Sequence, residues 1–133
     1  MMDFKTDMKS LSKEECLMQI EKAKWLDSPI CPYCFSTRSS KMKGSLRHHC
    51  NECNTSFSVT VNTIFHNSKL PLQKWFSAIE IMLDNNGNIS AKKLQLKLNV
   101  TYKTAWYLVN RINRALREQK DFLINIVNYN TNS

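Results

Sequence analysis

Long apolar runs are missing from this sequence of 133 residues. No stretch approaches the roughly 18–20 apolar residues that a transmembrane helix requires, so we expect no membrane span. The first five residues, Met1-Met2-Asp3-Phe4-Lys5, also lack the apolar core of a signal peptide. These two absences predict a cytoplasmic protein.

Acidic residues are scarce beyond the first thirty positions. Six of the eleven Asp and Glu residues lie before residue 30, and the single acid after Lys120 is Asp121. Two-metal phosphoryl chemistry needs several convergent carboxylates on a rigid scaffold. The sequence also contains no Ser-His-Asp arrangement, P-loop or HExxH motif. We therefore predict no catalytic residues and a protein that is not an enzyme.

Positive charge, in contrast, is abundant and unevenly spread. The chain has 19 Lys and Arg against 11 Asp and Glu, a net charge of +8. Residues 84–120 hold eight basic and two acidic side chains, a net of +6, whereas residues 1–30 hold five and six. Such a concentration is typical of a protein that binds a polyanion. A solvated basic face without any ligand would give the same pattern.

Five cysteines are present, and an odd number in a reducing compartment does not favour a disulfide framework. Four of them form two CxxC pairs that are separated by fifteen residues: Cys31 with Cys34, and Cys50 with Cys53. Zinc favours four tetrahedral ligands, and a complete thiolate shell leaves no position for water. We therefore predict one structural Zn²⁺ ion held by these four side chains.

The segment around the two CxxC pairs predicts a zinc ribbon. Residues 39–42 and 46–49 can form two short strands around Gly44, and residues 57–61 predict a third strand. So small a module buries too little apolar surface to fold alone, so the metal supplies much of its folding free energy.

Three further residues near these motifs could be taken for ligands. His48 and His49 adjoin Cys50, but four thiolates already fill the shell, so we interpret both as strand residues. Cys16 is isolated within a helical pattern and is interpreted as a small buried apolar residue.

The rest of the sequence predicts helices. A capping box at 12–15 opens a helix through about Trp25. Pro71 suits the first position of a second helix, whose apolar residues from Leu72 to Leu83 repeat with a 3.6-residue period. We expect an α+β protein with four parts: an N-terminal helix (1–28), a zinc ribbon of about three short antiparallel strands (29–66), a helical helix-turn-helix module (67–120) and an apolar tail (121–133).

Two further helices have the layout of a helix-turn-helix. Ser90 can cap a short helix through about Lys97, residues 98–100 form a tight turn, and Thr101 can cap a longer helix to about Gln119. Helical hairpins with exposed lysines are common, so this layout alone is a moderate signal. The local charge of +6 and the adjoining ribbon favour DNA binding.

The two faces of the longer helix differ in chemistry. The apolar residues within about 60° of Ala105 on a helical wheel are Leu108, Val109, Ile112 and Leu116. The opposite face carries side chains that suit phosphates and base edges: Lys103, Tyr107, Asn110, Arg114 and Arg117. Trp106 lies between the faces, so packing in the core and contact with DNA both stay open for it.

Residues 11–118 resemble the N-terminal region of insertion-sequence transposases that carry a zinc ribbon before a helix-turn-helix. The resemblance rests on an ordered series of short segments, which is more specific than the CxxC pairs alone. These segments are Glu14-Glu15-Cys16, Lys24-Trp25, Cys31-Pro32-Tyr33-Cys34, Cys50-Asn51-Glu52-Cys53, Phe57-Ser58-Val59, Thr63-Ile64-Phe65-His66-Asn67-Ser68, Pro71-Leu72-Gln73-Lys74-Trp75-Phe76, Thr101-Tyr102-Lys103-Thr104-Ala105-Trp106 and Arg111-Ile112.

In such transposases this region recognises the terminal inverted repeats of the element. The resemblance therefore implies binding to double-stranded DNA by the second helix of the helix-turn-helix, with the ribbon as an auxiliary contact. We expect the DNA-binding residues to be Lys92, Lys93, Thr101, Tyr102, Lys103, Thr104, Trp106, Tyr107, Asn110, Arg111, Arg114 and Arg117. The family cuts DNA with a later RNase H-like domain, and we expect no part of it here.

Two residues depart from the family pattern. Phe35 stands in the first knuckle where the family usually has Gly, which tolerates positive φ, so we expect strain there. Asn99 stands in the turn where Gly is usual, and Asn tolerates the left-handed conformation well.

The role of the apolar tail stays open. Residues 121–127 are unusually apolar, and three roles are considered: a strand packed on the first helix, a self-association element that makes a dimer, or the stub of a missing domain.

For the function of the protein, we favour a DNA-binding regulator or recruitment factor that is cytoplasmic and associated with the nucleoid. The alternatives are the recognition subunit of a split transposase whose catalytic chain is separate, or an adaptor that docks on other nucleic-acid machinery.

Overall fold

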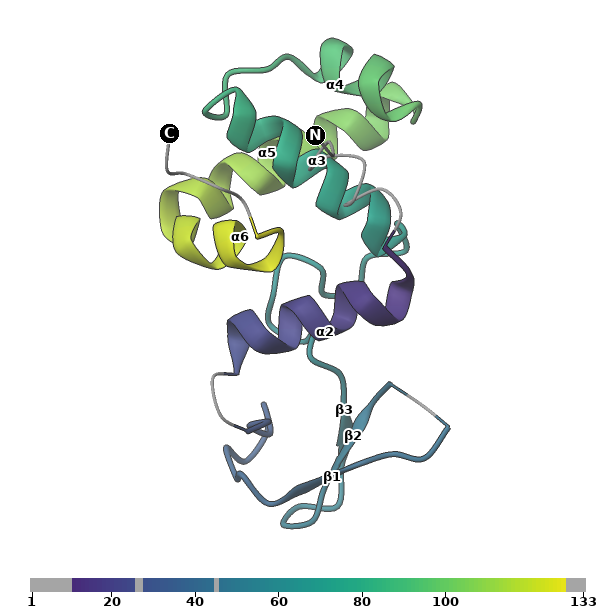
Figure 1. The fold of residues 1–133 in the computed structure, drawn as a ribbon, viewed down its shortest axis with the longest axis vertical. Coiled ribbons are helices and arrows are strands. Elements are labelled where there is room, and N and C mark those ends of the chain that lie inside the picture. The colour runs from purple at the N-terminus through teal and green to yellow at the C-terminus, as the bar shows by residue number, and fades with distance from the viewer. Residues whose placement is uncertain (1–10, 26–27, 45, 129–133) are drawn as a thin grey trace, which may run out of the picture.

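The computed structural model describes residues 11–25, 28–44 and 46–128. Within these ranges the helices are α2 (Lys13–Lys24), α3 (Leu72–Asp84), α4 (Ala91–Leu98), α5 (Tyr102–Glu118) and α6 (Lys120–Ile126), and the strands are β1 (Ser39–Lys41), β2 (His48–Cys50) and β3 (Ser56–Phe57). The strands lie at one end of the molecule, α3 to α6 at the other, and α2 between them (Figure 1). The predicted α+β class is confirmed.

Helix α2 begins at the predicted capping box. The Ser12 hydroxyl accepts from the Glu15 amide at 3.1 Å, and the Glu15 carboxylate accepts from the Ser12 amide at 2.9 Å. These two bonds satisfy amides that a helix N-terminus otherwise leaves without partners. One face of α2 is buried at Cys16, Leu17 and Ile20. Burial, with the nearby Glu15 carboxylate, raises the pKa of the Cys16 thiol to about 11, so it behaves as the apolar residue that we expected.

The strands form an antiparallel sheet in the order β1-β2-β3, with Ser39 opposite Cys50 and His48 opposite Phe57. The predicted hairpin of β1 and β2 is present, but β3 is two residues long and does not extend to residue 61. The reason lies in α2, because the Lys24 ammonium donates to the carbonyls of Val59 at 3.0 Å and Val61 at 2.6 Å. Those carbonyls therefore bind a side chain, where a longer β3 would need them for a ladder.

An aromatic cluster joins the ribbon to α2. The ring of His48 stacks on Phe57 at a centroid distance of 5.6 Å, and Trp25 meets both rings edge-on. His48 is 5% exposed, and its Nε2 lies 2.9 Å from the Glu21 carboxylate of α2. The interpretation of His48 as a strand residue is therefore correct, and its side chain faces α2 and not the cysteines.

Helices α3, α4 and α5 pack against one another and form the helical module. Pro71 lies one residue before its expected place, as the N-cap of α3, and the buried stripe runs from Trp75 to Leu83. The Lys74 ammonium donates to the carbonyl of Leu98, which ties α3 to the end of α4. Gly87, at φ +80°, brings the α3–α4 turn so close to α5 that an added Cβ would lie 2.5 Å from Asn113 Oδ1.

The apolar tail, for which a strand packed on the first helix was one of three expectations, forms helix α6 instead of a strand. Leu123, Ile126 and Val127 are buried, and their spacing of three and four residues places them on one face of a helix. That face packs against α2. The segment therefore packs on the first helix of its own chain, as one of the three expectations stated. Residues 129–133 of the tail lie outside the described residues. The four-part division of the chain stays a prediction.

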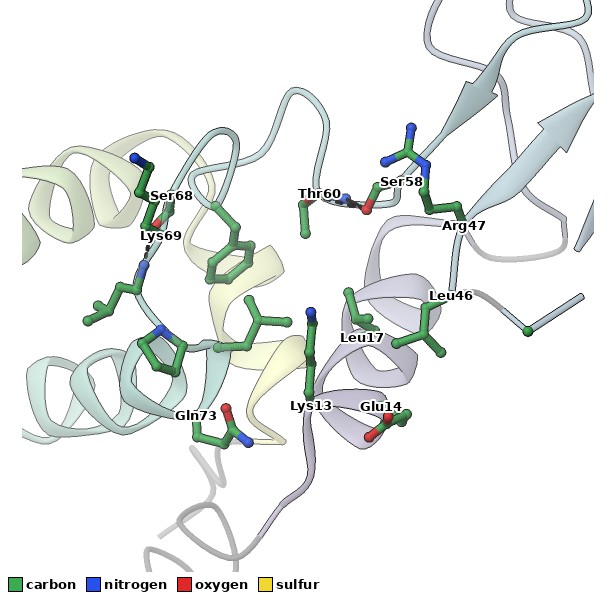
Figure 2. A pocket seen from close by; sticks show the side chains of 15 residues that line it. Lys13, Glu14, Leu17, Leu46, Arg47, Ser58, Thr60, Ser68, Lys69 and Gln73 are labelled. Atoms are coloured by element: carbon green, nitrogen blue, oxygen red, sulfur yellow. Dashed lines mark hydrogen bonds between the residues drawn. The ribbon is translucent and has the colours of Figure 1, made fainter. Parts of the chain in front are cut away.

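A cleft of about 890 Å³ lies between the ribbon and the helical module. Its walls come from the N-terminal turn of α2, the β1–β2 turn and the segment that connects β3 to α3 (Figure 2). None of the helices in the described part of the chain is long and apolar enough to span a bilayer.

Candidate metal centre and nucleic-acid interface

The two CxxC knuckles have the same backbone geometry. In the first, the Phe35 amide donates to the Cys31 carbonyl at 2.9 Å, and in the second the Asn54 amide donates to the Cys50 carbonyl at 2.9 Å. Phe35 and Asn54 occupy equivalent left-handed positions, with φ of 65° and 61°. Asn adopts this conformation readily whereas Phe does not, so the expected strain falls on the first knuckle.

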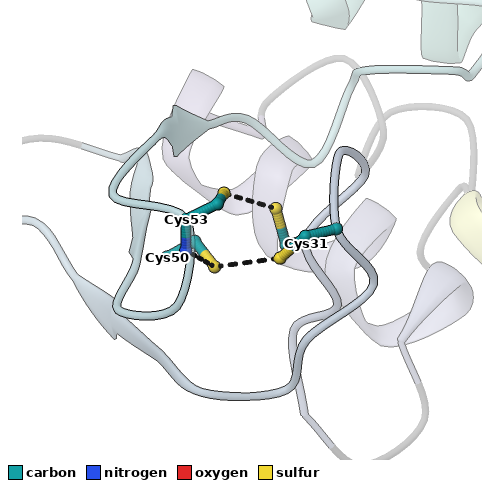
Figure 3. Close-up of side chains that lie close together, drawn as sticks. Cys31, Cys50 and Cys53 are labelled. Carbon is teal, nitrogen blue, oxygen red and sulfur yellow. Dashed lines mark hydrogen bonds between the residues drawn. The ribbon is translucent and has the colours of Figure 1, made fainter.

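The two knuckles bring their four sulfur atoms together, as Figure 3 shows. The Sγ atoms of Cys31, Cys34, Cys50 and Cys53 all lie within 4.8 Å of one another. The Cys31–Cys53 pair is 3.7 Å apart and the Cys34–Cys50 pair 3.5 Å. Zn–S bonds of about 2.3 Å at tetrahedral angles place sulfurs about 3.8 Å apart, so the cluster fits a zinc ion.

The thiols in this cluster differ in acidity. The Thr55 hydroxyl and amide lower the pKa of Cys53 to about 7, against the opposing effect of desolvation. For Cys34, a backbone hydrogen bond from Ser36 lowers the pKa, but desolvation and the neighbouring thiols outweigh it and raise the pKa to about 12. Four adjacent thiolates repel one another, and a divalent cation at their centre removes that cost. The protein therefore holds one structural zinc ion at these four cysteines.

The helix-turn-helix forms at the expected residues and with the expected caps. The Ser90 hydroxyl accepts from the Lys93 amide at 3.1 Å, and the Thr101 hydroxyl accepts from the Thr104 amide at 3.2 Å. Asn99 ends α4 in the left-handed conformation at φ 57°, as its position in the turn predicted. These caps fix where α5 begins and so fix which of its side chains face outward.

Helix α5 has an apolar inner face and a polar outer face. Ala105, Leu108 and Ile112 are completely buried, and Val109 is half-buried. Two roles were open for Trp106, packing in the core and contact with DNA. Its side chain is 56% exposed, so the prediction of core packing is wrong. The predicted residues that are exposed are Lys92, Lys93, Thr101, Tyr102, Lys103, Trp106, Tyr107, Asn110, Arg114 and Arg117.

Two predicted DNA-binding residues, Thr104 and Arg111, are half-buried. The Arg111 guanidinium donates to the carbonyl of Ile64 at 3.3 Å and lies 5.4 Å from the ring of Tyr107. Arg111 thus joins α5 to the segment that follows the ribbon. Arg114 forms an exposed ion pair with Glu118 at 3.4 Å, an interaction that solvent weakens.

Leu96 on α4 is 72% exposed and is not among the DNA-binding residues predicted from the sequence. A helical wheel of α4 could have identified it, because it lies four residues from Lys92 on the outer face. The cations of the cleft lie in three segments far apart in the chain, at Lys13, Arg47 and Lys69, so no local spacing could have grouped them.

The fold and the metal cluster define a zinc-ribbon protein with an attached helix-turn-helix. Comparison with known proteins gives the kind of ribbon, since residues 11–56 match the family model described as the transposase zinc-ribbon domain. The ribbon segment is therefore similar to this domain family, which confirms the resemblance seen in the sequence.

A relative supports the same conclusion over a longer stretch. The chain is 30% identical over 119 residues to an "uncharacterized protein in transposable element ISH50" from Halobacterium salinarum. The match covers 87% of this chain and 39% of that protein, so the chain spans about two fifths of the relative's length. No solved structure matches the chain.

Proposed function

We propose that the protein binds double-stranded DNA in a sequence-specific manner, with α5 lying in the major groove. The observation that carries this proposal is the outer face of α5. This outer face exposes Lys103, Asn110 and Arg114, while the inner face of α5 packs against α3 and α4. Long basic and amide side chains on a rigid helix are suited to base edges and phosphates.

The first turns of α5 are the part that would enter the groove. In a helix-turn-helix, the N-terminal residues of the second helix contact base edges and the preceding helix lies over the backbone. Tyr102 and Trp106 are 53% and 56% exposed and stand one turn apart, so they offer apolar contact to thymine methyl groups. Lys92 and Lys93 are exposed at the start of α4, and in this proposal they contact phosphates.

We infer further that the described residues act in recognition without catalysis. Within the described ranges, the four cysteines are the one cluster of His, Cys, Asp or Glu that could share a metal ion. Cysteine shells of this kind are structural. The role would be that of a regulator or recruitment factor in the cytoplasm, associated with the nucleoid.

A second candidate is the recognition part of a transposase whose catalysis resides elsewhere. The length of the relative favours this candidate, because the matched region is 39% of that protein. Co-purification of the chain with a polypeptide that bears a carboxylate triad would support it over the regulator. A dimer of this chain remains a proposal that sizing of the purified protein would test.

Selection of bound duplexes from a random pool tests the proposed function. The proposal predicts an enriched motif, and it predicts that Asn110→Ala or Trp106→Ala changes base preference at one or two positions by about 1–3 kcal/mol. Lys22→Gln, on α2 and far from α5 in the chain, serves as the control that leaves the motif unchanged. A pool that shows no enrichment with zinc-loaded protein would overturn sequence-specific binding.

A further inference from the structure

The cleft between the ribbon and the helical module is rich in positive charge. Three exposed cations surround it, Lys13 from α2, Arg47 beside β2 and Lys69 before α3, against the single carboxylate of Glu14. Figure 2 shows Lys13 in the middle of the cleft, with Lys69 and Arg47 on either side. Within the described residues, the ammonium groups of Lys13 and Lys69 form no hydrogen bond or ion pair.

The hydroxyl groups of the cleft add further donors. Ser68 Oγ accepts from Trp75 Nε1 at 2.8 Å and from the Leu70 amide at 3.2 Å. Both of its lone pairs are thus used, and only its proton remains to be donated. Ser58 Oγ accepts from the Thr60 amide at 3.3 Å and shares one hydrogen bond with Thr60 Oγ1, so this pair has one hydroxyl proton left.

These groups select the chemistry of a ligand. The ammonium groups and the Ser68 hydroxyl can donate but not accept, and the cations outnumber the one carboxylate, so the cleft favours an anionic ligand that is rich in acceptor atoms. The oxygens of a phosphodiester meet this requirement. The half-buried side chains of Leu46, Leu70 and Leu72 between the cations offer apolar contact to deoxyribose.

The cleft continues toward the helix-turn-helix. Pro71 and Gln73 line both this cleft and a second hollow of about 550 Å³, whose other walls include Lys74, Lys97 and Leu98. Leu98 immediately precedes the turn into α5. The N-terminal ends of α2, α3 and α5 also lie on the same side of the molecule in Figure 1. One ligand could therefore contact the cleft and the start of α5 together.

We propose that this cleft holds the sugar–phosphate backbone of the same DNA duplex that α5 reads. The inference rests on the proposed function and adds a second anchor, at which Lys13, Arg47 and Lys69 contact phosphates outside the base-read site. The ribbon and α2 thus lengthen the contacted DNA beyond the helix-turn-helix. Because phosphate contacts carry no base information, this anchor raises affinity for all sequences alike.

Salt titration of duplex binding by the full chain tests the anchor. Each lost phosphate contact lowers the slope of log K against log salt by about 0.9, so Lys13→Gln with Lys69→Gln should lower it by about 1–2. The control, Lys22→Gln with Lys41→Gln, removes the same charge at exposed positions outside the cleft and should leave the slope unchanged. Equal slopes for the cleft and control variants would overturn the anchor.

Interference with modified DNA gives a second measurement that requires no variant. Duplexes with a neutral methylphosphonate at each position in turn should reveal two separated groups of sensitive phosphates for the wild-type protein. In the Lys13→Gln, Lys69→Gln variant one group should disappear and the selected base motif should stay. A single group in both proteins would overturn the anchor and leave the function of α5 standing, whereas absence of any duplex binding would overturn the proposed function itself.

Discussion

His48 and Glu21 join the zinc ribbon to the helical part of the protein across a distance of 2.9 Å. The side chain of His48 is 6% exposed and that of Glu21 is 24% exposed, so water competes little for the bond. His48 belongs to β2, next to the second knuckle, and Glu21 belongs to α2. This contact fixes the orientation of the ribbon on α2 and so shapes one wall of the cleft.

Removal of the Glu21 carboxylate should therefore destabilise the protein. Glu21→Ala leaves a buried imidazole nitrogen without its partner, and we expect a loss of about 1–3 kcal/mol in the free energy of unfolding by urea. Glu52→Ala is the matched control, because Glu52 binds Arg38 at the same 2.9 Å but with 53% and 68% exposed side chains. It should cost about 0–1 kcal/mol. Equal losses for both variants would contradict the structural role of the buried bond.

Relief of strain at the first knuckle should stabilise the ribbon. Phe35 has φ 65° and is 76% exposed. Packing of its side chain therefore does little to offset the strain of its backbone. Phe35→Gly should raise the free energy of unfolding by about 0.5–1 kcal/mol, since the relief of about 1–2 kcal/mol exceeds the entropy that glycine adds to the unfolded chain.

Asn54→Gly provides the comparison for this change at the equivalent position of the second knuckle. Asn tolerates its φ of 61°, so the substitution should give no gain in thermal unfolding. A stabilisation of Asn54→Gly as large as that of Phe35→Gly would show that the strain at Phe35 is not the cause.

The protein should bind one zinc ion per chain, and this zinc content should decrease as the pH is lowered. Because thiolates bind the metal, protons compete for the same sulfurs. The stability that zinc supplies is thus present at higher pH and is lost as pH falls from about 8 to about 5. Metal analysis alongside circular dichroism measures both changes. Cys50→Ser should lose the ion and the ribbon, whereas Cys16→Ala should keep the ion, and zinc retained by Cys50→Ser would contradict the four-thiolate site.

Close packing of the α3–α4 turn on α5 should make Gly87 sensitive to any side chain. Gly87→Ala combines a strained φ of +80° with a Cβ that lies 2.5 Å from Asn113 Oδ1. Gly44→Ala has a similar φ of +71° but no atom within 4 Å of the new Cβ. Urea unfolding should show a loss of about 1–2 kcal/mol for Gly44→Ala and a larger loss for Gly87→Ala. Comparable losses would contradict the close contact with α5.

Local patterns in the sequence were sufficient for much of the fold and the metal site. The capping box of Ser12 and Glu15, the Ser90 and Thr101 caps and the CxxC spacing each depend on residues that lie within a few positions. The sequence therefore predicted α2, the helix-turn-helix and the zinc ligands. The Asn99 turn was also predictable, because its left-handed conformation is a local property.

Contacts between distant segments account for what the sequence could not predict. Strand β3 is short because Lys24, more than thirty positions earlier, takes the carbonyls of Val59 and Val61. Residues 120–126 form a helix because α2 offers an apolar face that Leu123 and Ile126 can reach. The bond between His48 and Glu21 and the cations of the cleft depend on tertiary structure in the same way.

The outer face of α5 is proposed to lie against duplex DNA. A salt titration with the selected duplex, comparing wild type with the Lys103→Ala, Arg114→Ala, Arg117→Ala variant, tests this contact most directly. We predict that the variant binds more weakly and that its slope of log K against log salt is lower by about 2–3, since each lost phosphate contact removes about 0.9. An unchanged affinity and an unchanged slope in a variant that keeps its zinc and its helices would contradict the claim.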